Sequence, residues 1–384
     1  MAINVLKPRY HTEDILEEIR KCLDSGWTGM GNRTEEFEKE WIKYTDLANA
    51  HYVNSATSAL HLAVAAFKIL DNWQPDSEII TTPLTFVSTN HAILYENLTP
   101  VFCDVDDQLC LDPNKLASLI TAKTKAVMFV GVGGNIGQYN KVREICKKHN
   151  LKLILDASHM AGTKVGKGYD GVAYVDTQVG WDADAVVFSF QAVKNLPTAD
   201  SGMICFLDEK YDRLARQLSW LGIDKDTFSR TGDKGSYRWD YGVPNVGFKY
   251  NGNSIMASIA LGQLRHLDAD NQYRNALVSL YTEELKDLKQ IEIIQHNPKC
   301  ISARHLFQVA TPDREALLQH FYKHDIYPGV HYKNNKQYPM YKDAKGDVPV
   351  AEYYSDRIIS LPLHLNLTTD DITVITKILK AFYE

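Results

Sequence analysis

The chain has 384 residues, of which 45% are hydrophobic and 23% charged, and its formal net charge is −6. This composition fits a soluble globular enzyme with a core large enough for two lobes, and the mild acidity without a dense Lys/Arg block argues against a nucleic-acid partner. The sequence has neither a signal-peptide-like start nor about 18 consecutive apolar residues, and its six scattered cysteines form no CxxC pair. We therefore expect a cytoplasmic protein without membrane segments, a disulfide framework or a metal site.

Helical and strand patterns alternate through the first two thirds of the chain. Residues 12–26 predict an amphipathic helix, and residues 57–70 predict a strongly apolar one. Later segments predict buried strands: EIITTP, PVFCDVD, KAVMFVGV, LKLILDA, AVVFSF and GMICFLD. Because helical segments such as NKVREICKKHN lie between several of these runs, we predict an α/β fold with a mainly parallel sheet flanked by helices.

The chain changes character at residues 237–253, which are rich in Gly, Asn and Tyr. Residues 254–288 then predict one long helix or two joined helices, and the chain ends in a helical pattern over 370–384. We therefore predict a large α/β domain over 1–245 and a smaller α+β domain over 246–384. The N-terminal helix is free to pack on the smaller domain.

Small and hydroxyl residues precede the apolar helix in the segment NSATSALHLAV. The free N–H groups and positive dipole end of such a helix bind phosphate well, and Thr57 and Ser58 would add hydroxyl donors. The same pattern also fits an ordinary N-cap.

Two further candidates follow strands, at the sheet edge where open parallel sheets bind ligands. Asp156 ends one strand, with His159 three residues on, and its carboxylate would hold a cationic ring nitrogen or cap a turn. Lys194 follows the strand that contains Ser189, and by itself it fits a solvated surface lysine much better than a catalytic one, because most lysines are solvated. Together, an anion site, a carboxylate and a lysine are the three groups that pyridoxal phosphate (PLP) requires.

Other catalytic motifs are incomplete or absent. Ile136 occupies the third glycine's place in GVGGNIG, so the dinucleotide fingerprint GxGxxG is not formed. The sequence contains no GxxxxGK[ST], no HExxH and no nucleophile elbow. Hydride transfer, phosphoryl transfer and serine hydrolysis are therefore disfavoured.

At these residues the chain resembles the DegT/DnrJ/EryC1/StrS family of PLP-dependent sugar aminotransferases, which has the aspartate-aminotransferase fold (type I). It is especially similar to the branch that aminates UDP-4-keto-pentose in lipid A modification. The likeness runs nearly end to end and rests on the order of several motifs: SGWTGMGNRTEEFEKEW, NSATSALHLA, TTPLTFVSTNHAIL, DASHMAGT, FSFQAVKNLPTADSGM, GFKYNGNSIMASIALGQLRHLD, GVHY and SLPLHLNLT.

The resemblance implies a role for each matching residue. Lys194 would bind the cofactor covalently and move a proton between substrate and cofactor carbons. Asp156 would keep the pyridine nitrogen protonated, and His159 would lie near the phenolic oxygen. Phe86 would stack on the ring, which contributes about 0.5–1.5 kcal/mol beyond area burial, although a core aromatic would look the same in sequence.

The resemblance also implies a phosphate site, a homodimer and a substrate pocket. The backbone of Ala56, with Thr57, Ser58 and Ser189, would hold the phosphate. Lys249 or Asn251 would reach it from the partner chain of a homodimer with shared active sites, although both also fit polar loop residues. Five residues are assigned to the substrate: Trp27, Thr28, Gln191, His331 and Tyr332.

The chain departs from the family pattern after the lysine. The family usually has Gly-Glu-Gly-Gly there, whereas this chain has ADSGM, with Asp200 and Ser201 in place of Glu and Gly. The segment 163–182 is also longer than usual, and it would reshape the sugar pocket or form a surface hairpin. These differences affect the expected substrate more than the expected chemistry.

The resemblance implies an aminotransferase that moves an amino group from L-glutamate to a nucleotide-linked keto sugar for amino-sugar, lipopolysaccharide or O-antigen biosynthesis. An aminotransferase for a small ketone and a PLP-dependent sugar dehydratase remain alternatives, although dehydratase relatives replace the lysine with histidine. A non-catalytic regulator or scaffold on the same fold is a third.

Overall fold

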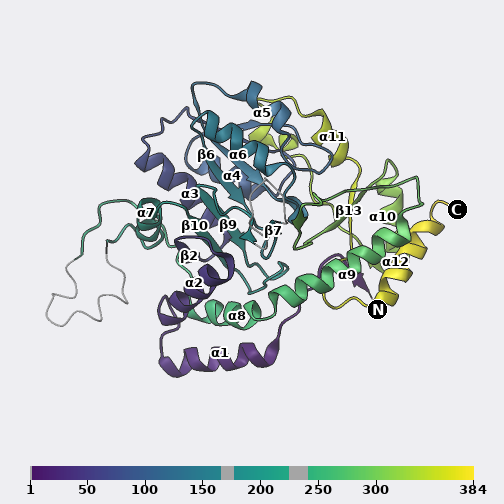
Figure 1. The fold of residues 1–384 in the computed structure, drawn as a ribbon, viewed down its shortest axis with the longest axis horizontal. Coiled ribbons are helices and arrows are strands. Elements are labelled where there is room, and N and C mark those ends of the chain that lie inside the picture. The colour runs from purple at the N-terminus through teal and green to yellow at the C-terminus, as the bar shows by residue number, and fades with distance from the viewer. Residues whose placement is uncertain (1, 166–176, 225–240) are drawn as a thin grey trace.

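The computed structural model describes residues 2–165, 177–224 and 241–384. Its centre is a seven-stranded sheet (Figure 1). In spatial order the strands are β2 (Ala50–Val53), β10 (Gly202–Phe206), β9 (Ala185–Ser189), β6 (Lys152–Asp156), β5 (Thr124–Val130), β3 (Glu78–Thr81) and β4 (Thr99–Phe102). Only β10 runs antiparallel to its neighbours. The predicted mainly parallel α/β sheet is thus confirmed.

Helices cover both faces of this sheet, which is why its strands are continuous apolar runs rather than alternating ones. On one face, α3 (Ala56–Leu70), α4 (Val87–Tyr95) and α7 (Glu209–Ser219) contribute to a common core. On the other face, the core includes side chains of α2 (Asn32–Thr45), α5 (Pro113–Leu119), α6 (Tyr139–Lys148) and α8 (Ser254–Leu264).

The predicted helical stretch 254–288 forms two helices, α8 and α9 (Leu267–Leu285), which follow one another along one edge of the molecule (Figure 1). The helix α1 (Thr12–Ser25) packs against α8. Because Ala257 and Leu261 of α8 join the core beneath the large sheet, the helix after residue 245 belongs in part to that core. The domain boundary at 245 stays a prediction.

The C-terminal part builds a second core around an antiparallel sheet of β11 (Glu292–Ile293), β13 (Phe307–Ala310) and β15 (Ile358–Leu361). Helices α9, α10 (Arg314–Tyr322) and α12 (Thr369–Ala381) pack on it, and α11 (Pro349–Ser355) joins a neighbouring cluster. The N-terminal β1 (Ile3–Asn4) pairs with β14 (Ile326–Tyr327), so the chain's first residues lie beside its C-terminal part.

A third small sheet has the order β12 (Cys300–Ile301), β7 (Lys164–Val165) and β8 (Thr177–Gln178). The strands β7 and β8 pair antiparallel on either side of residues 166–176. These residues make up most of the long loop predicted at 163–182, and they lie outside the described residues. Among the described helices, none combines the length and apolarity that crossing a membrane requires.

Candidate active site

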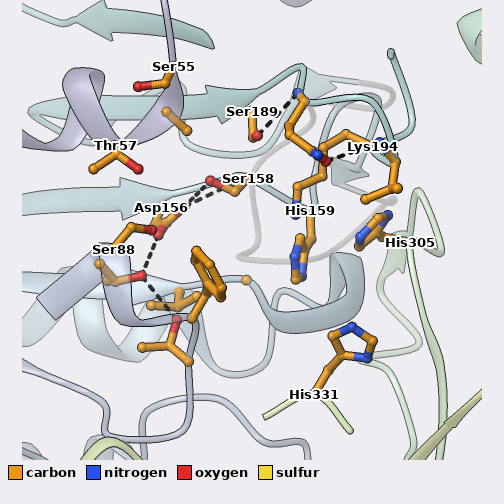
Figure 2. A pocket seen from close by; sticks show the side chains of 18 of the residues that line it. Ser55, Thr57, Ser88, Asp156, Ser158, His159, Ser189, Lys194, His305 and His331 are labelled. Atoms are coloured by element: carbon orange, nitrogen blue, oxygen red, sulfur yellow. Dashed lines mark hydrogen bonds between the residues drawn. The ribbon is translucent and has the colours of Figure 1, made fainter. Parts of the chain in front are cut away.

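A cavity of about 430 Å³ opens where three parallel strands end and α3 begins. Its wall includes the last residues of β5, β6 and β9 and the first residues of α3: Val130, Asp156, Ser189, Ser55, Ala56 and Thr57. Figure 2 shows Asp156 and Ser158 on one side of this pocket, and Lys194 with His159, His305 and His331 on the other. The fold therefore gathers residues that are far apart in the sequence.

The N-terminus of α3 presents free backbone donors to the cavity. Ser55 is the N-cap, and its hydroxyl oxygen accepts a hydrogen bond from the N–H of Ser58 at 3.1 Å. Within the described residues, the N–H groups of Ala56 and Thr57 have no hydrogen-bond partner. A 15-residue helix with two open N–H groups at its positive end is a good site for a phosphate.

A glycine on the neighbouring strand allows this helix start to approach closely. A Cβ atom at Gly202 would lie 2.6 Å from the backbone nitrogen of Ala56 and 2.9 Å from the carbonyl oxygen of Phe188. Any side chain at position 202 would therefore displace the helix start or the strand. Of the glycine-rich sequence expected after Lys194 this chain keeps only Gly202, and these short distances explain why a glycine is needed there.

Neighbouring hydroxyl groups hold the carboxylate of Asp156, which is 3% exposed, in a fixed orientation. One oxygen accepts from the backbone N–H of Ser158 at 3.1 Å and from its hydroxyl at 2.6 Å, and the other accepts from the hydroxyl of Thr89 at 2.8 Å. A carboxylate oxygen accepts about two hydrogen bonds, so Oδ2, which accepts only from Thr89, can also receive a protonated ring nitrogen.

Lys194 lies on a turn after β9. Hydrogen bonds from the backbone N–H groups of this turn to Gln191 hold it, and the side chain of Lys194 takes no part in them. The N–H of Lys194 donates to the carbonyl of Gln191 at 2.8 Å, and the N–H of Val193 donates to Oε1 of Gln191 at 3.1 Å. Burial lowers the pKa of the Lys194 ammonium to about 8, although the negative charge of Asp156 partly offsets this effect. The amine is therefore easier to deprotonate than that of an ordinary lysine.

Aromatic and imidazole rings form the rest of the wall. Phe86 is 57% exposed, and its ring centroid lies 6.0 Å from that of Tyr332. The Tyr332 hydroxyl lies 3.0 Å from Nε2 of His159. Nδ1 of His331 lies 2.9 Å from the hydroxyl of Ser360. Burial, helped by the nearby Lys194 charge, lowers the pKa of the His331 ring to about 4, so the ring is neutral at pH 7.

Most of the predicted site residues meet at this cavity. Its lining contains Ala56, Thr57, Phe86, Asp156, His159, Ser189, Gln191, Lys194, His331 and Tyr332.

Five predicted residues do not line the cavity of their own chain. The hydroxyl of Ser58 turns away and donates to Asn54 at 2.6 Å, and Trp27 and Thr28 lie at the end of α1. The Nζ of Lys249 lies 3.2 Å from the ring centroid of Trp220, and Asn251 donates to the carbonyl of Gly252. The last two were expected to act from a partner chain, and this role stays a prediction.

The sequence reasoning missed several wall residues, including Ser55, Thr89, Ser158 and His305. Ser55 and Ser158 lie within motifs that had been recognised, one or two residues from the residues chosen. His305 precedes β13 and reaches the cavity only through the tertiary fold, so no local pattern marks it.

Comparison with known proteins identifies the family. The model of the DegT/DnrJ/EryC1/StrS aminotransferase family matches residues 9–380. The chain belongs to this family. It is 31% identical over 369 residues to the spore coat polysaccharide biosynthesis protein SpsC of Bacillus subtilis, covering 93% of this chain and 91% of SpsC.

Solved structures agree with this assignment. The chain resembles Helicobacter pylori PseC, an aminotransferase involved in the biosynthesis of pseudoaminic acid, with a TM-score of 0.89, 27% identity and 99% coverage of both chains. It also resembles Spr1654 of Streptococcus pneumoniae in its PLP form, with a TM-score of 0.87, 26% identity, and coverage of 99% of this chain and 98% of that one. Spr1654 is also known in a PMP form.

The protein is therefore a PLP-dependent aminotransferase of the aspartate-aminotransferase fold, as the sequence predicted. The residues present also fit this cofactor. The cavity offers open N–H groups for a phosphate, an oriented carboxylate for a ring nitrogen, an exposed aromatic ring for stacking and a lysine with a lowered pKa.

Proposed function

We propose that this enzyme transfers the amino group of L-glutamate to a nucleotide-linked keto sugar in the biosynthesis of an amino sugar for a surface glycan, in the cytosol. The observation that carries this proposal is the meeting of Lys194, Asp156 and the open end of α3 around one cavity. The polysaccharide biosynthesis named for SpsC and the description of Spr1654 as a putative sugar aminotransferase support the sugar as acceptor.

Five groups of this chain would hold the cofactor by non-covalent contacts. The N–H groups of Ala56 and Thr57, with the hydroxyl of Ser189, would bind the phosphate. The ring of Phe86 would cover one face of the pyridine. Asp156 would keep a proton on the ring nitrogen, and the donors Ser158 and Thr89 hold its carboxylate in the required orientation.

When bound, PLP supplies a carbonyl group that exchanges for an amine and a ring that accepts electron density. Lys194 Nζ would take a proton from the substrate carbon in one half-reaction and return one in the other. A pKa of about 8 suits this work, because both the charged and the neutral amine are present near neutral pH. One side chain thus serves as base and as acid.

We also propose that the active site is shared between two subunits. Lys249 or Asn251 of each chain would reach the phosphate in the other chain's cavity. If the sites are shared, mixing two inactive variants, Lys194→Ala and a double variant of Lys249 and Asn251, should restore activity, because one site of each mixed dimer is intact. No restored activity after verified subunit exchange would contradict the shared site.

Two measurements on the purified holoenzyme test the reaction. Addition of L-glutamate should bleach the visible absorption band of the bound cofactor. A panel of nucleotide-linked 3-keto and 4-keto sugars, read by mass spectrometry, should then reveal one acceptor that gains an amine. If no common amino donor bleaches the band, the protein is not an active aminotransferase. If the band bleaches but the enzyme aminates a small ketone and none of the sugars, the protein is an aminotransferase and the proposed sugar acceptor is wrong.

A further inference from the structure

Two neighbouring histidines in the cavity wall have hydrogen-bond partners that fix which ring nitrogen carries the proton. The rings of His159 and His305 lie 4.3 Å apart, centroid to centroid, and both side chains are at least 94% buried. Burial, helped by nearby positive charge, lowers both pKa values well below the ordinary value of 6.5, so each ring is neutral and carries one proton.

The proton of His159 lies on Nε2. Its Nδ1 accepts a hydrogen bond from the backbone N–H of Gly133 at 3.1 Å, and a nitrogen that accepts carries no proton. Nε2 therefore donates to the hydroxyl of Tyr332, which lies 3.0 Å away. Because a backbone N–H can only donate, this assignment does not depend on the protonation of any neighbouring side chain.

The proton of His305 lies on the other nitrogen. Its Nδ1 faces Oδ1 of Asn195 at 3.0 Å. The amide orientation of Asn195 is fixed, because its Nδ2 donates to the carbonyl of Ala303 and to Oδ1 of Asn271, both at 2.7 Å. Asn271 is fixed in turn by donating to the carbonyl of Ala161 at 2.9 Å. Oδ1 of Asn195 can only accept, so Nδ1 of His305 must donate.

The unprotonated Nε2 of His305 is therefore a hydrogen-bond acceptor in the wall beside Lys194 (Figure 2). Among the described residues, no group donates to this nitrogen. The hydroxyl of Tyr332 accepts from Nε2 of His159, no hydrogen bond joins it to His305 among the described residues, and the exposed side chain of Phe86 is apolar. Since this nitrogen lines the cavity, a ligand that covers it without supplying a donor leaves the acceptor buried and unpaired, which is costly, so a ligand with a donor in this position is favoured.

We propose that His305 Nε2 recognises the substrate by accepting a hydrogen bond from the hydroxyl on the carbon next to the keto group. This step rests on the proposed keto-sugar acceptor. It assigns the sugar a class, because the acceptor must carry a free hydroxyl beside the carbon that is aminated. The two rings are opposite tautomers: Nε2 of His159 is a donor, and Nε2 of His305 is an acceptor. The donor is used by Tyr332, so only the acceptor on His305 is open to the substrate.

The tautomers are tested without any turnover, by ¹H–¹⁵N correlation of imidazole nitrogens in the holoenzyme labelled with ¹⁵N-histidine. His305→Asn and His159→Asn identify the two rings by the loss of their signals. We expect a protonated Nδ1 and a bare Nε2 for His305, and the reverse for His159. A protonated Nε2 on His305, or a doubly protonated ring at pH 7.5, would overturn the inference.

Recognition is tested with a matched pair of substrates and a matched pair of variants. The substrates are the nucleotide-linked keto sugar that the panel identifies and its analogue without the hydroxyl beside the carbonyl. For UDP-4-keto-pentose, whose C3 hydroxyl is the only one beside the carbonyl, this analogue is the 3-deoxy sugar. The variant His305→Asn keeps the donor to Asn195 but loses the acceptor. The variant His305→Gln keeps an acceptor near the position of Nε2 but loses that donor.

We expect wild-type enzyme and His305→Gln to prefer the hydroxylated sugar in kcat/KM by roughly 10- to 100-fold, and His305→Asn to treat both sugars nearly equally. A purely structural role would lower both rates together in His305→Asn and leave the preference intact, which overturns recognition alone. If the wild-type enzyme bleaches with glutamate but aminates no nucleotide-linked keto sugar of the panel, the proposed acceptor falls, and the recognition step falls with it.

Discussion

Replacing Lys194 by methionine should stabilise the cofactor-free protein while abolishing its activity. Burial lowers the pKa of this lysine from its ordinary value of 10.5 to about 8. Each pKa unit corresponds to about 1.36 kcal/mol, so the buried charge costs about 3 kcal/mol at pH 7. Methionine has a similar length and no charge, and it therefore avoids this cost.

The pH dependence of the gain follows from the direction of the shift. Between pH 8 and 10.5 the unfolded chain binds the lysine proton and the folded chain does not, so wild-type stability rises with pH through this window. The advantage of Lys194→Met is therefore fully present below pH 8. It should fall to about 1.4 kcal/mol at pH 9.5 and vanish above about pH 11.

Urea unfolding of both proteins without cofactor, at pH 7 and pH 9.5, measures this difference. Lys43→Met is the matched control, because the side chain of Lys43 is 77% exposed and its removal should change stability little at either pH. If Lys194→Met is no more stable than wild type at pH 7, or if its advantage does not shrink at pH 9.5, Lys194 does not carry a desolvated charge.

Three further predictions concern cofactor binding and catalysis. Asp156→Asn should retain the cofactor yet lower kcat roughly 100-fold or more, because a neutral amide no longer favours a proton on the ring nitrogen; an unchanged kcat would remove Asp156 from that role. Gly202→Ala should raise the Kd of the cofactor, since its Cβ would lie 2.6 Å from the Ala56 nitrogen, whereas Gly29→Ala has no atom within 4 Å and should bind normally. Equal Kd values for these two variants would show that the start of α3 does not hold the phosphate. Lys194→Ala should bind the cofactor without a covalent bond and show no turnover in assays of amine transfer, and normal amination by this variant would end the proposed mechanism.

The sequence predicted the large sheet well because buried parallel strands are short apolar runs that end in recognisable polar residues. Asp156 was found in this way, since it ends such a run, whereas Ser189 was assigned to the phosphate through the family resemblance. The strand β2 was missed because its four residues, AHYV, include a polar imidazole that pairs with Ser219, and its burial depends on the tertiary fold.

Some site residues were wrongly chosen or missed, for reasons that particular residues show. Ser58 was chosen for the phosphate, but Ser55 caps α3 and directs Ser58 toward Asn54, and the register of a helix start cannot be read to within one residue. His305 and Thr89 act through partners far along the chain, at Asn195 and Asp156, which no local spacing reveals. The order of motifs identified the family, whereas the hydrogen-bond network required the structure.

Asp200 and Ser201 stand where the family has Glu and Gly, and the structure explains the second of these differences. Ser201 is buried, and its hydroxyl lies 2.7 Å from that of Thr198. Thr198 donates to the carbonyl of Phe190, so Ser201 ties the start of β10 to the turn that follows Lys194. Asp200 is exposed in the cavity wall, and nothing in the structure explains its choice over glutamate.

The most direct test of the central claim is to reduce the holoenzyme with borohydride, digest it and locate the cofactor by mass spectrometry. The account predicts a single phosphopyridoxyl adduct, on Lys194, and its absence when glutamate is added before the reductant. An adduct on another lysine, or none on a protein that shows the cofactor's absorption band, would contradict the assignment of the active site.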